Sequence, residues 1–157
     1  LPGQTNLLIV TGSIKNLGHN KRIYGFGRAL KDRLSDIRVT DIVENQDDEE
    51  LAYRITAQKL REHPEVNMIY MVSAGVNGVV RAVSERSKKI HILCFDSTPQ
   101  IVSLLKERKI TATICQEPYE QGYRAVQILF DAVVNGVLPV SEFQYTDCQI
   151  KIRQNIE

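Results

Sequence analysis

The distribution of apolar and polar residues along the chain predicts six β-strands. The six segments are apolar or alternate apolar with polar residues, and they are rich in β-branched side chains, which favour extended backbone. They are Asn6–Thr11, Ile37–Val43, Met68–Val72, Ile90–Phe95, Ile110–Cys115 and about Phe143–Arg153.

Helical patterns separate these strands, because apolar residues recur between them at spacings of three and four. Each such stripe predicts one helix face that packs on a core. The first helix carries the stripe Ile23, Phe26, Leu30 and Leu34, and the third carries Val76, Val79, Val80 and Val83.

The predicted helix starts carry capping signals. The second helix begins at Asp47 or Asp48, because Glu50 has the spacing of a capping box relative to Asp47. The acidic residues around this start are interpreted as a solvated helix entrance, where the helix dipole favours negative charge. The fourth and fifth helices begin with Pro99 and Pro118, since the first helical turn offers no partner for the amide that proline lacks.

The alternation of strands and helices predicts an α/β fold, with a parallel sheet that has helices on both faces. In such sheets ligands bind beyond the carboxyl ends of the strands. A binding site is therefore expected in the loops that follow Thr11, Val43, Val72, Phe95 and Cys115.

The composition is that of one soluble domain. The chain has 157 residues, 43% of them hydrophobic, which is enough for a core of its own. A formal charge of +1 gives no basic excess that would favour nucleic acid or an anionic membrane. No apolar run approaches the roughly 20 residues that span a bilayer, and the start of the chain lacks the features of a signal peptide.

The cysteines and histidines give no sign of a metal site or other cofactor. Two cysteines end strand-like runs, where a small buried thiol is common, so we interpret all three as reduced and the compartment as cytoplasm. The histidines show no metal-ligand spacing with one another or with the cysteines. These residues are Cys94, Cys115, Cys148, His19, His63 and His91.

No catalytic constellation is found. The loop Gly12–Gly18 joins a strand to a helix, yet His19 and Asn20 follow it where a P-loop needs Lys and Ser or Thr. His91 and Cys94 are three residues apart on one strand, so their side chains point to opposite faces. A nucleophile elbow and a carboxylate pair placed for acid and base roles are also lacking. The sequence therefore predicts a binding protein and not an enzyme.

Three polar residues stand at the predicted carboxyl edge: Arg22 in the first helix, Asp96 after the fourth strand and Gln116 after the fifth. A guanidinium and a carboxylate that converge there would bind several hydroxyl groups of one compact ligand. Each residue also has a structural explanation. Arg22 is then a solvated first-turn residue, Asp96 a helix cap, and Gln116 a partner of the backbone only.

The segments around these residues, in this order and spacing, resemble the effector-binding region of lactose-repressor-type (LacI family) transcription regulators. The similarity covers nearly the whole chain. The family's Arg shortly before Gly-Phe, its Gly-Phe-Asp and its Thr-x-x-Gln with a later Gly are similar to Arg22-Ile-Tyr-Gly25-Phe26, to Cys94-Phe95-Asp96 and to Thr113, Gln116 and Gly122.

The resemblance implies a periplasmic-binding-protein-like fold (type I) of two α/β lobes, of which residues 1–157 hold mainly the C-terminal lobe. Residues 117–137 are then a helix that belongs to the other lobe. An N-terminal lobe and a DNA-binding helix-turn-helix are expected to lie outside this chain. Because the stripe of Val126, Leu129, Phe130 and Val133 loses its partner, a chain by itself is expected to form a homodimer, swap this helix or repack it.

The resemblance also implies roles for single residues. Arg22 would donate to ligand oxygens, Asp96 would accept from hydroxyls or an amine, and Gln116 would sit at the hinge between lobes. Asp47 lies where family members often place a pocket residue, although helix capping explains it as well. His19 and Asn20 are weaker candidates.

One departure from the family concerns specificity. The family often has Asn-Asp after the third strand, whereas this chain has Ser73-Ala74-Gly75. Sugar specificity is therefore not carried over whole. Asn77 is a candidate replacement, although an Asn in a first helical turn is more often structural.

The expected function is that of a sensor in a cytoplasmic transcription regulator. A small effector, a sugar or a related polyol, would close the two lobes and bias DNA binding elsewhere in the protein. The alternative is the solute-binding protein of a sugar transporter, which has the same lobes behind a signal or lipoprotein peptide. Neither function needs a cofactor, and the first has no membrane partner.

Overall fold

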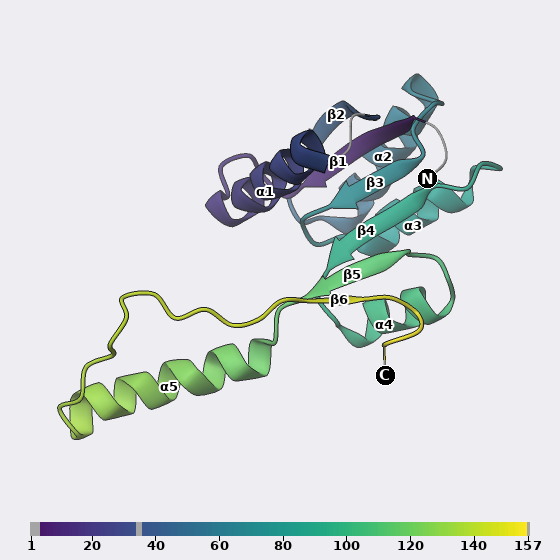
Figure 1. The fold of residues 1–157 in the computed structure, drawn as a ribbon. Coiled ribbons are helices and arrows are strands. Elements are labelled where there is room, and N and C mark those ends of the chain that lie inside the picture. The colour runs from purple at the N-terminus through teal and green to yellow at the C-terminus, as the bar shows by residue number, and fades with distance from the viewer. Residues whose placement is uncertain (1–3, 34–35, 157) are drawn as a thin grey trace.

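The computed structural model describes residues 4–33 and 36–156. Strands and helices alternate along them, as the hydrophobic pattern predicts (Figure 1). The strands are β1 (Thr5–Thr11), β2 (Ile37–Glu44), β3 (Met68–Met71), β4 (His91–Phe95), β5 (Ala112–Cys115) and β6 (Gln149–Lys151), and the helices are α1 (Leu17–Arg33), α2 (Glu49–Glu62), α3 (Val76–Ser84), α4 (Pro99–Lys106) and α5 (Pro118–Val134). Leu34, the last residue of the predicted first stripe, lies outside the described residues.

The strands form one sheet in the order β2-β1-β3-β4-β5-β6. Strands β1 to β5 are parallel, and β6 pairs antiparallel with β5. The predicted α/β fold with a parallel sheet is therefore confirmed, and its last strand runs against the others. All five parallel strands end at one edge, which we call the carboxyl edge, and the opposite edge is called the amino edge.

Strand residues alternate between two apolar layers, one on each face of the sheet. Helices α2, α3 and α4 cover one face, and α1 covers the other, so helices lie on both faces as predicted (Figure 1). The first layer includes Leu8, Val10, Ile69, Met71, Ile92, Leu60, Val79 and Leu105, and the second includes Leu7, Ile9, Tyr70, Val72, Phe95, Ile23, Phe26 and Leu30. Burying each large apolar side chain contributes about 1.5–3 kcal/mol, which makes these two layers the main stabilisation of the fold.

Helices α2 and α3 pack closely at Gly78. A methyl group at this glycine would lie 2.0 Å from the carbonyl oxygen of Glu49 and 2.8 Å from the amide nitrogen of Tyr53. Both of those atoms belong to the backbone and cannot turn away. The absence of a side chain at Gly78 therefore sets the distance between the two helices.

The start of α2 decides between the two predicted caps. The Asp48 carboxylate accepts from the amide of Leu51 at 2.6 Å, so Asp48 is the N-cap. Asp47 is left outside the helix with a left-handed backbone (φ 59°). Its carboxylate is therefore available for another role.

The sixth strand differs from its prediction. Strand β6 covers only Gln149–Lys151, although the predicted strand was about Phe143–Arg153. Residues 135–148, which lead from α5 to β6, are irregular. Aromatic residues of this segment, Phe143 and Tyr145, are exposed. A strand forms only where a neighbour accepts its hydrogen bonds, and β5 offers a partner for the last part alone.

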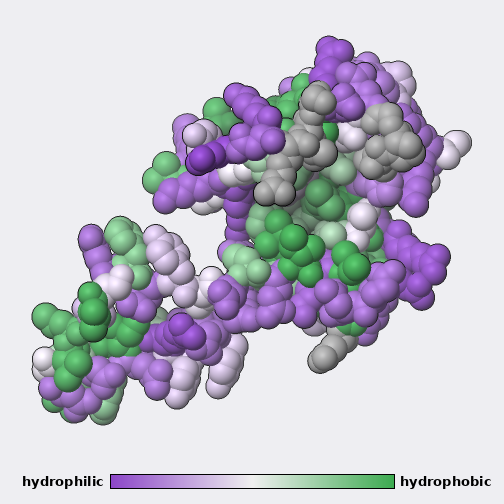
Figure 2. Space-filling model, viewed as in Figure 1, coloured by the Kyte–Doolittle hydropathy of each residue, from purple (hydrophilic) through white to green (hydrophobic). Residues whose placement is uncertain are grey.

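Helix α5 and residues 135–148 project from the sheet and its helices as an arm (Figure 1). None of the residues of α5 is buried. Apolar side chains gather on this arm, as Figure 2 shows; the exposed ones include Val126, Leu129, Phe130, Val133, Leu138 and Val140. We call the rest of the molecule, β1 to β6 with α1 to α4, the lobe.

The described helices include none that is both long enough and apolar enough to cross a membrane. The three cysteines are free thiols, with Cys94 and Cys115 buried and Cys148 exposed. Burial raises the pKa of the Cys94 thiol to about 11, so it stays protonated at neutral pH and is a poor nucleophile.

Candidate ligand-binding site

The predicted site residues lie along the carboxyl edge of the sheet. The loops after β1, β2 and β3, the start of α1 and the ends of β4 and β5 all meet there, because the five parallel strands end together. Arg22, Asp96, Gln116 and Asp47 come from four of these segments.

Arg22 is held in a fixed orientation by two contacts. Its Nη1 donates to the carbonyl oxygen of Val72 at 2.7 Å, and its guanidinium lies 4.0 Å from the centre of the Phe95 ring. A guanidinium held against a ring keeps its remaining N–H groups at its rim, where they can still donate. Arg22 is half-buried, so it is not a freely solvated first-turn residue.

An aromatic layer lies beneath this guanidinium. The Tyr70 ring stacks on Phe26 at 4.1 Å between centres and contacts Phe95 at 5.9 Å. Burial raises the pKa of Tyr70 to about 12, so its hydroxyl stays neutral. The layer gives Phe95 a rigid support, and through Phe95 it supports Arg22.

Asp96 and Gln116 form a hydrogen-bonded pair on neighbouring strands. The Gln116 Nε2 donates to the Asp96 Oδ1 at 2.9 Å, and the carboxylate is otherwise exposed. The backbone of Asp96 is left-handed (φ 73°), and its carbonyl accepts from the buried Thr113 hydroxyl at 2.7 Å. Helix α4 is capped by Thr98, so capping does not account for Asp96.

Asp47 lies near the other end of the edge. Its Oδ1 accepts from the amide of Ala74 at 3.0 Å. A methyl group at Gly12 would meet both carboxylate oxygens of Asp47 and the ring of His19, at 2.7 to 2.8 Å. The bare backbone at Gly12 thus lets Asp47 and His19 approach one another over the end of β1.

Asn45 is a residue that the sequence analysis missed. It is fully buried, its Nδ2 donates to the carbonyl of Ala74 at 2.6 Å, and its Oδ1 accepts from Ser73 Oγ at 2.9 Å. Asn45 therefore fixes the loop after β3, which in turn supplies the contacts of Arg22 and Asp47. The signal in the sequence that could have indicated this role was the uncharged Asn45 within the mostly acidic stretch Glu44–Glu50.

The weaker candidates have local partners. The Nδ2 of Asn20 donates to the carbonyl of Ile14, and Asn77 donates to Glu49 on α2. Asn77 therefore does not replace the family's Asn-Asp at the edge. His19 Nδ1 lies 3.4 Å from the Thr11 hydroxyl and stays at the edge.

The edge presents hydrogen-bonding groups of both kinds on a rigid base. The guanidinium of Arg22 donates, the carboxylates of Asp47 and Asp96 accept, and the aromatic layer supports the guanidinium. Within the described residues, no group of three or more His, Cys, Asp and Glu side chains is arranged to hold a metal ion. The arrangement suits a neutral polyhydroxylated ligand.

The fold and its polar carboxyl edge define a doubly wound α/β protein of the ligand-binding class. The chain belongs to the periplasmic binding protein domain family, whose sequence pattern matches residues 1–136. This family comprises binding proteins and not enzymes.

Relatives with known ligands are similar over nearly the whole chain. The D-allose-binding periplasmic protein of Escherichia coli (strain K12) is 25% identical over 146 residues, which are 88% of this chain and 47% of that protein. The glucose-galactose binding protein GanP of Geobacillus stearothermophilus is 30% identical, with a TM-score of 0.89 over 98% of this chain and 55% of GanP. The sugar-binding protein of a sugar ABC transporter from Bacillus halodurans is 25% identical, with a TM-score of 0.86 over 98% of this chain and 57% of its own. The chain thus spans about half the length of these relatives.

These relatives correct two expectations. The predicted role in transcription regulation is wrong, because these relatives are sugar-binding proteins, one of them of a sugar ABC transporter. They give no support to the DNA partner that accompanied this prediction. The predicted cytoplasmic location is also wrong, because the curated relative is a periplasmic protein. LacI-type regulators and solute-binding proteins share this fold. The residues that suggested a regulator therefore could not distinguish these two classes of protein.

Proposed function

We propose that this chain is one lobe of the solute-binding protein of a sugar transporter, and that its carboxyl edge forms one wall of the sugar site. The observation that carries the proposal is the placement of Arg22. Its guanidinium is held by the Val72 carbonyl and the ring of Phe95, the residue directly before Asp96, and the Asp96 carboxylate is held by Gln116. A donor and an acceptor that are already positioned lose little entropy when a sugar binds.

The roles of the edge residues follow from their contacts. Arg22 donates to sugar oxygens, Asp96 and Asp47 accept from sugar hydroxyls, and Gln116 positions the Asp96 carboxylate at the boundary between lobe and arm. The proposed function is binding and release of the sugar, and the Cys94 thiol takes no part in it, since it is buried and stays protonated.

The arm belongs with a second lobe. The chain covers about half the length of its relatives, and the apolar stripe of α5 is exposed from Val126 to Val133. A second lobe that packs on this stripe removes it from water and supplies the other wall of the site. The chain is then mainly the C-terminal lobe, with residues 117–137 serving the other one. Without that lobe, two copies of the chain are expected to pair through their arms.

Calorimetry tests the proposed site. The two-lobed protein is titrated with D-glucose, D-galactose and D-allose, and the Asp96→Asn and Arg22→Gln variants are titrated with the sugar that binds best. Losing a charge-assisted hydrogen bond in a closed site costs about 1.5–3 kcal/mol, which weakens binding roughly ten- to a hundredfold.

Two matched variants serve as controls. Asp32→Asn and Arg28→Gln make the same charge changes on the exposed end of α1, near the amino edge, and should leave the affinity unchanged. Equal affinities in all four variants, or no binding of any sugar of the panel, would overturn the proposal.

A further inference from the structure

Two adjacent cavities lie at the amino edge of the sheet, away from the proposed sugar site. Both are lined by residues 86–88 and Ile90, in the segment that connects α3 to β4. The second cavity has a volume of about 320 Å³ and extends to Arg108 and Lys109, between α4 and β5. The proposed sugar-binding residues are at the opposite ends of the strands and have no part in it.

The second cavity is lined by five basic side chains: Arg86, Lys88, Lys89, Arg108 and Lys109. Within the described residues no carboxylate lines it, and Ser87 adds a hydroxyl group, whereas the Ser84 hydroxyl donates to the carbonyl of Arg81. The whole chain has 20 basic against 19 acidic residues, so this local excess is not a consequence of composition. Like charges brought together without carboxylates repel one another, which favours an anion between them.

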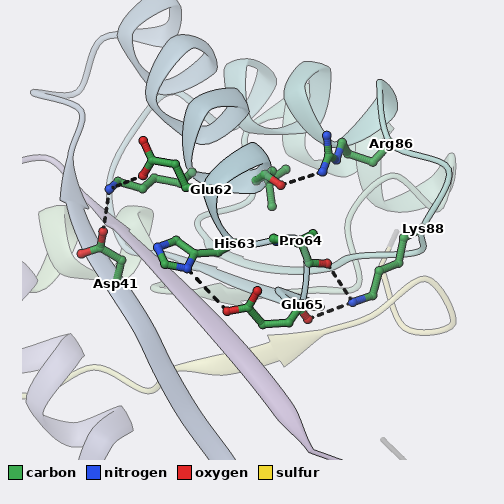
Figure 3. A network of polar contacts seen from close by, with 9 residues as sticks. Asp41, Glu62, His63, Pro64, Glu65, Arg86 and Lys88 are labelled. Atoms are coloured by element: carbon green, nitrogen blue, oxygen red, sulfur yellow. Dashed lines mark hydrogen bonds and ion pairs between the residues drawn. The ribbon is translucent and has the colours of Figure 1, made fainter.

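Three of the five basic residues already have partners. Lys88 Nζ donates to the carbonyls of Pro64 and Glu65, and Arg86 donates to the carbonyl of Leu60, so both neutralise the end of α2 (Figure 3). Lys109 pairs with Glu107 at 2.7 Å. Lys89 and Arg108 make no side-chain hydrogen bond or ion pair with the described residues and remain available to a ligand.

The backbone of Arg108 is strained. Its φ of 61° is left-handed, at the end of α4, where the amides of Arg108 and Lys109 donate to the carbonyls of Leu105 and Leu104. Glycine is the preferred residue in this helix-ending conformation, because it has no Cβ to clash. An arginine at such a position costs stability and places a free guanidinium at the mouth of the cavity.

We propose that this cavity binds a multivalent phosphate anion, through Lys89 and Arg108, with Arg86, Lys88 and Ser87 around it. A guanidinium matches two phosphate oxygens at once, and an ammonium group binds phosphate as a point charge. The size of the cavity fits a small phosphate compound or the phosphate group of a larger molecule. The site is separate from sugar binding and does not depend on it.

Calorimetry of the chain with inorganic pyrophosphate, at physiological salt, tests this proposal. The double variant Lys89→Gln/Arg108→Gly is expected to raise the dissociation constant at least about tenfold, the effect of losing about 1.4 kcal/mol. The control Arg28→Gln/Lys106→Gln removes the same charges outside the cavity and should change the constant by less than about twofold. Arg108→Gly relieves the strained backbone, so its melting temperature should rise while its affinity falls.

A second arm of the experiment distinguishes the source of the phosphate. Co-sedimentation with phosphatidylglycerol vesicles, and with phosphatidylcholine vesicles as the control, tests a lipid headgroup. Binding of either pyrophosphate or anionic vesicles that is lost in the double variant supports the site and identifies its source. No binding in either arm overturns the proposal, as do equal losses in the double variant and its control. Tighter binding of poly-glutamate than of pyrophosphate also overturns it, because the site would then recognise an acidic protein segment.

Discussion

The lobe and the arm contain the same kinds of apolar side chain in different surroundings. Leu105 in α4 has no exposed surface, whereas Leu129 in α5 is 63% exposed. Val79 in α3 is fully buried, and Val133 in α5 is 75% exposed. Both α3 and α5 carry a helical stripe, so an amphipathic pattern tells which face of a helix packs but not what covers it. The apolar residues of the lobe find their partners within this chain, whereas the apolar stripe of the arm is exposed.

The largest expected difference between the two regions is the cost of removing one leucine. Leu105→Ala leaves a cavity in the lobe and should lower the free energy of unfolding by about 2–5 kcal/mol. Leu129→Ala in the arm should change it by less than about 0.5 kcal/mol in a sample diluted until the chain is monomeric, since little buried contact is then lost. Urea unfolding followed by circular dichroism measures both. A cost at Leu129 close to that at Leu105 would show that the arm is packed in solution.

Replacing each of two helical glycines by alanine should change the stability of the chain in opposite directions. Gly78→Ala forces a methyl group against the backbone of α2 and should cost about 1–3 kcal/mol or more. Gly122→Ala in α5 meets nothing within 4 Å and should stabilise the chain by about 0.5–1 kcal/mol, because alanine favours helix. Thermal unfolding of the two variants measures both effects. Destabilisation by Gly122→Ala would mean that a partner lies close to that face of α5.

The smallest expected effect concerns ion pairs. In the lobe, Lys59 Nζ lies 2.9 Å from Asp41 on β2 and 2.8 Å from Glu62 on its own helix (Figure 3). The hydrogen bond from Lys59 lowers the pKa of Asp41 below its ordinary 3.8. The pair therefore contributes stability above pH 3.8, and this contribution is lost as the pH falls through the lowered pKa of the folded state. The effect is small, because water screens a partly exposed pair.

Unfolding midpoints between pH 2 and pH 6 measure this contribution. Asp41→Asn should flatten the acid side of the profile. The matched change in the arm is Glu120→Gln, which breaks the pair of Glu120 with Arg124 inside α5 and joins no two elements. It should leave the lobe's profile unchanged. A profile that Asp41→Asn leaves unaltered would contradict the assigned role of Lys59.

The strands and helices of the lobe could be predicted from the sequence, because the apolar residues of the sequence pattern are the residues that pack in its core. Strands β1 to β5 start and end within about two residues of the predicted bounds, since each is a short apolar run that fills one core. The antiparallel direction and short length of β6 could not be predicted. They depend on where the arm returns to the sheet and on the partner that β5 offers there.

The site could be predicted only in part. Arg22 was expected at the carboxyl edge because it lies near the start of the first helix, and Asp96 and Gln116 because they directly follow strands. The structure places Asp96 and Gln116 in contact. The role of Asn45 in holding the loop after β3 could not be predicted, because its partners Ser73 and Ala74 are far away in sequence. In the proposed function the choice of sugar also depends on a second wall of the site, for which these residues carry no information.

Because β5 pairs with β6, the arm begins and ends at neighbouring positions of the sheet. Cys115 and Gln149 are direct neighbours across the two antiparallel strands, so the chain leaves the sheet and returns to it at almost the same point. A two-residue hairpin turn that keeps Gln116 as its first residue could join the two strands in place of the arm. The arm is therefore an insertion that protein engineering could remove as one segment. Replacing it by such a turn would give a minimal lobe that keeps the sheet and its carboxyl edge.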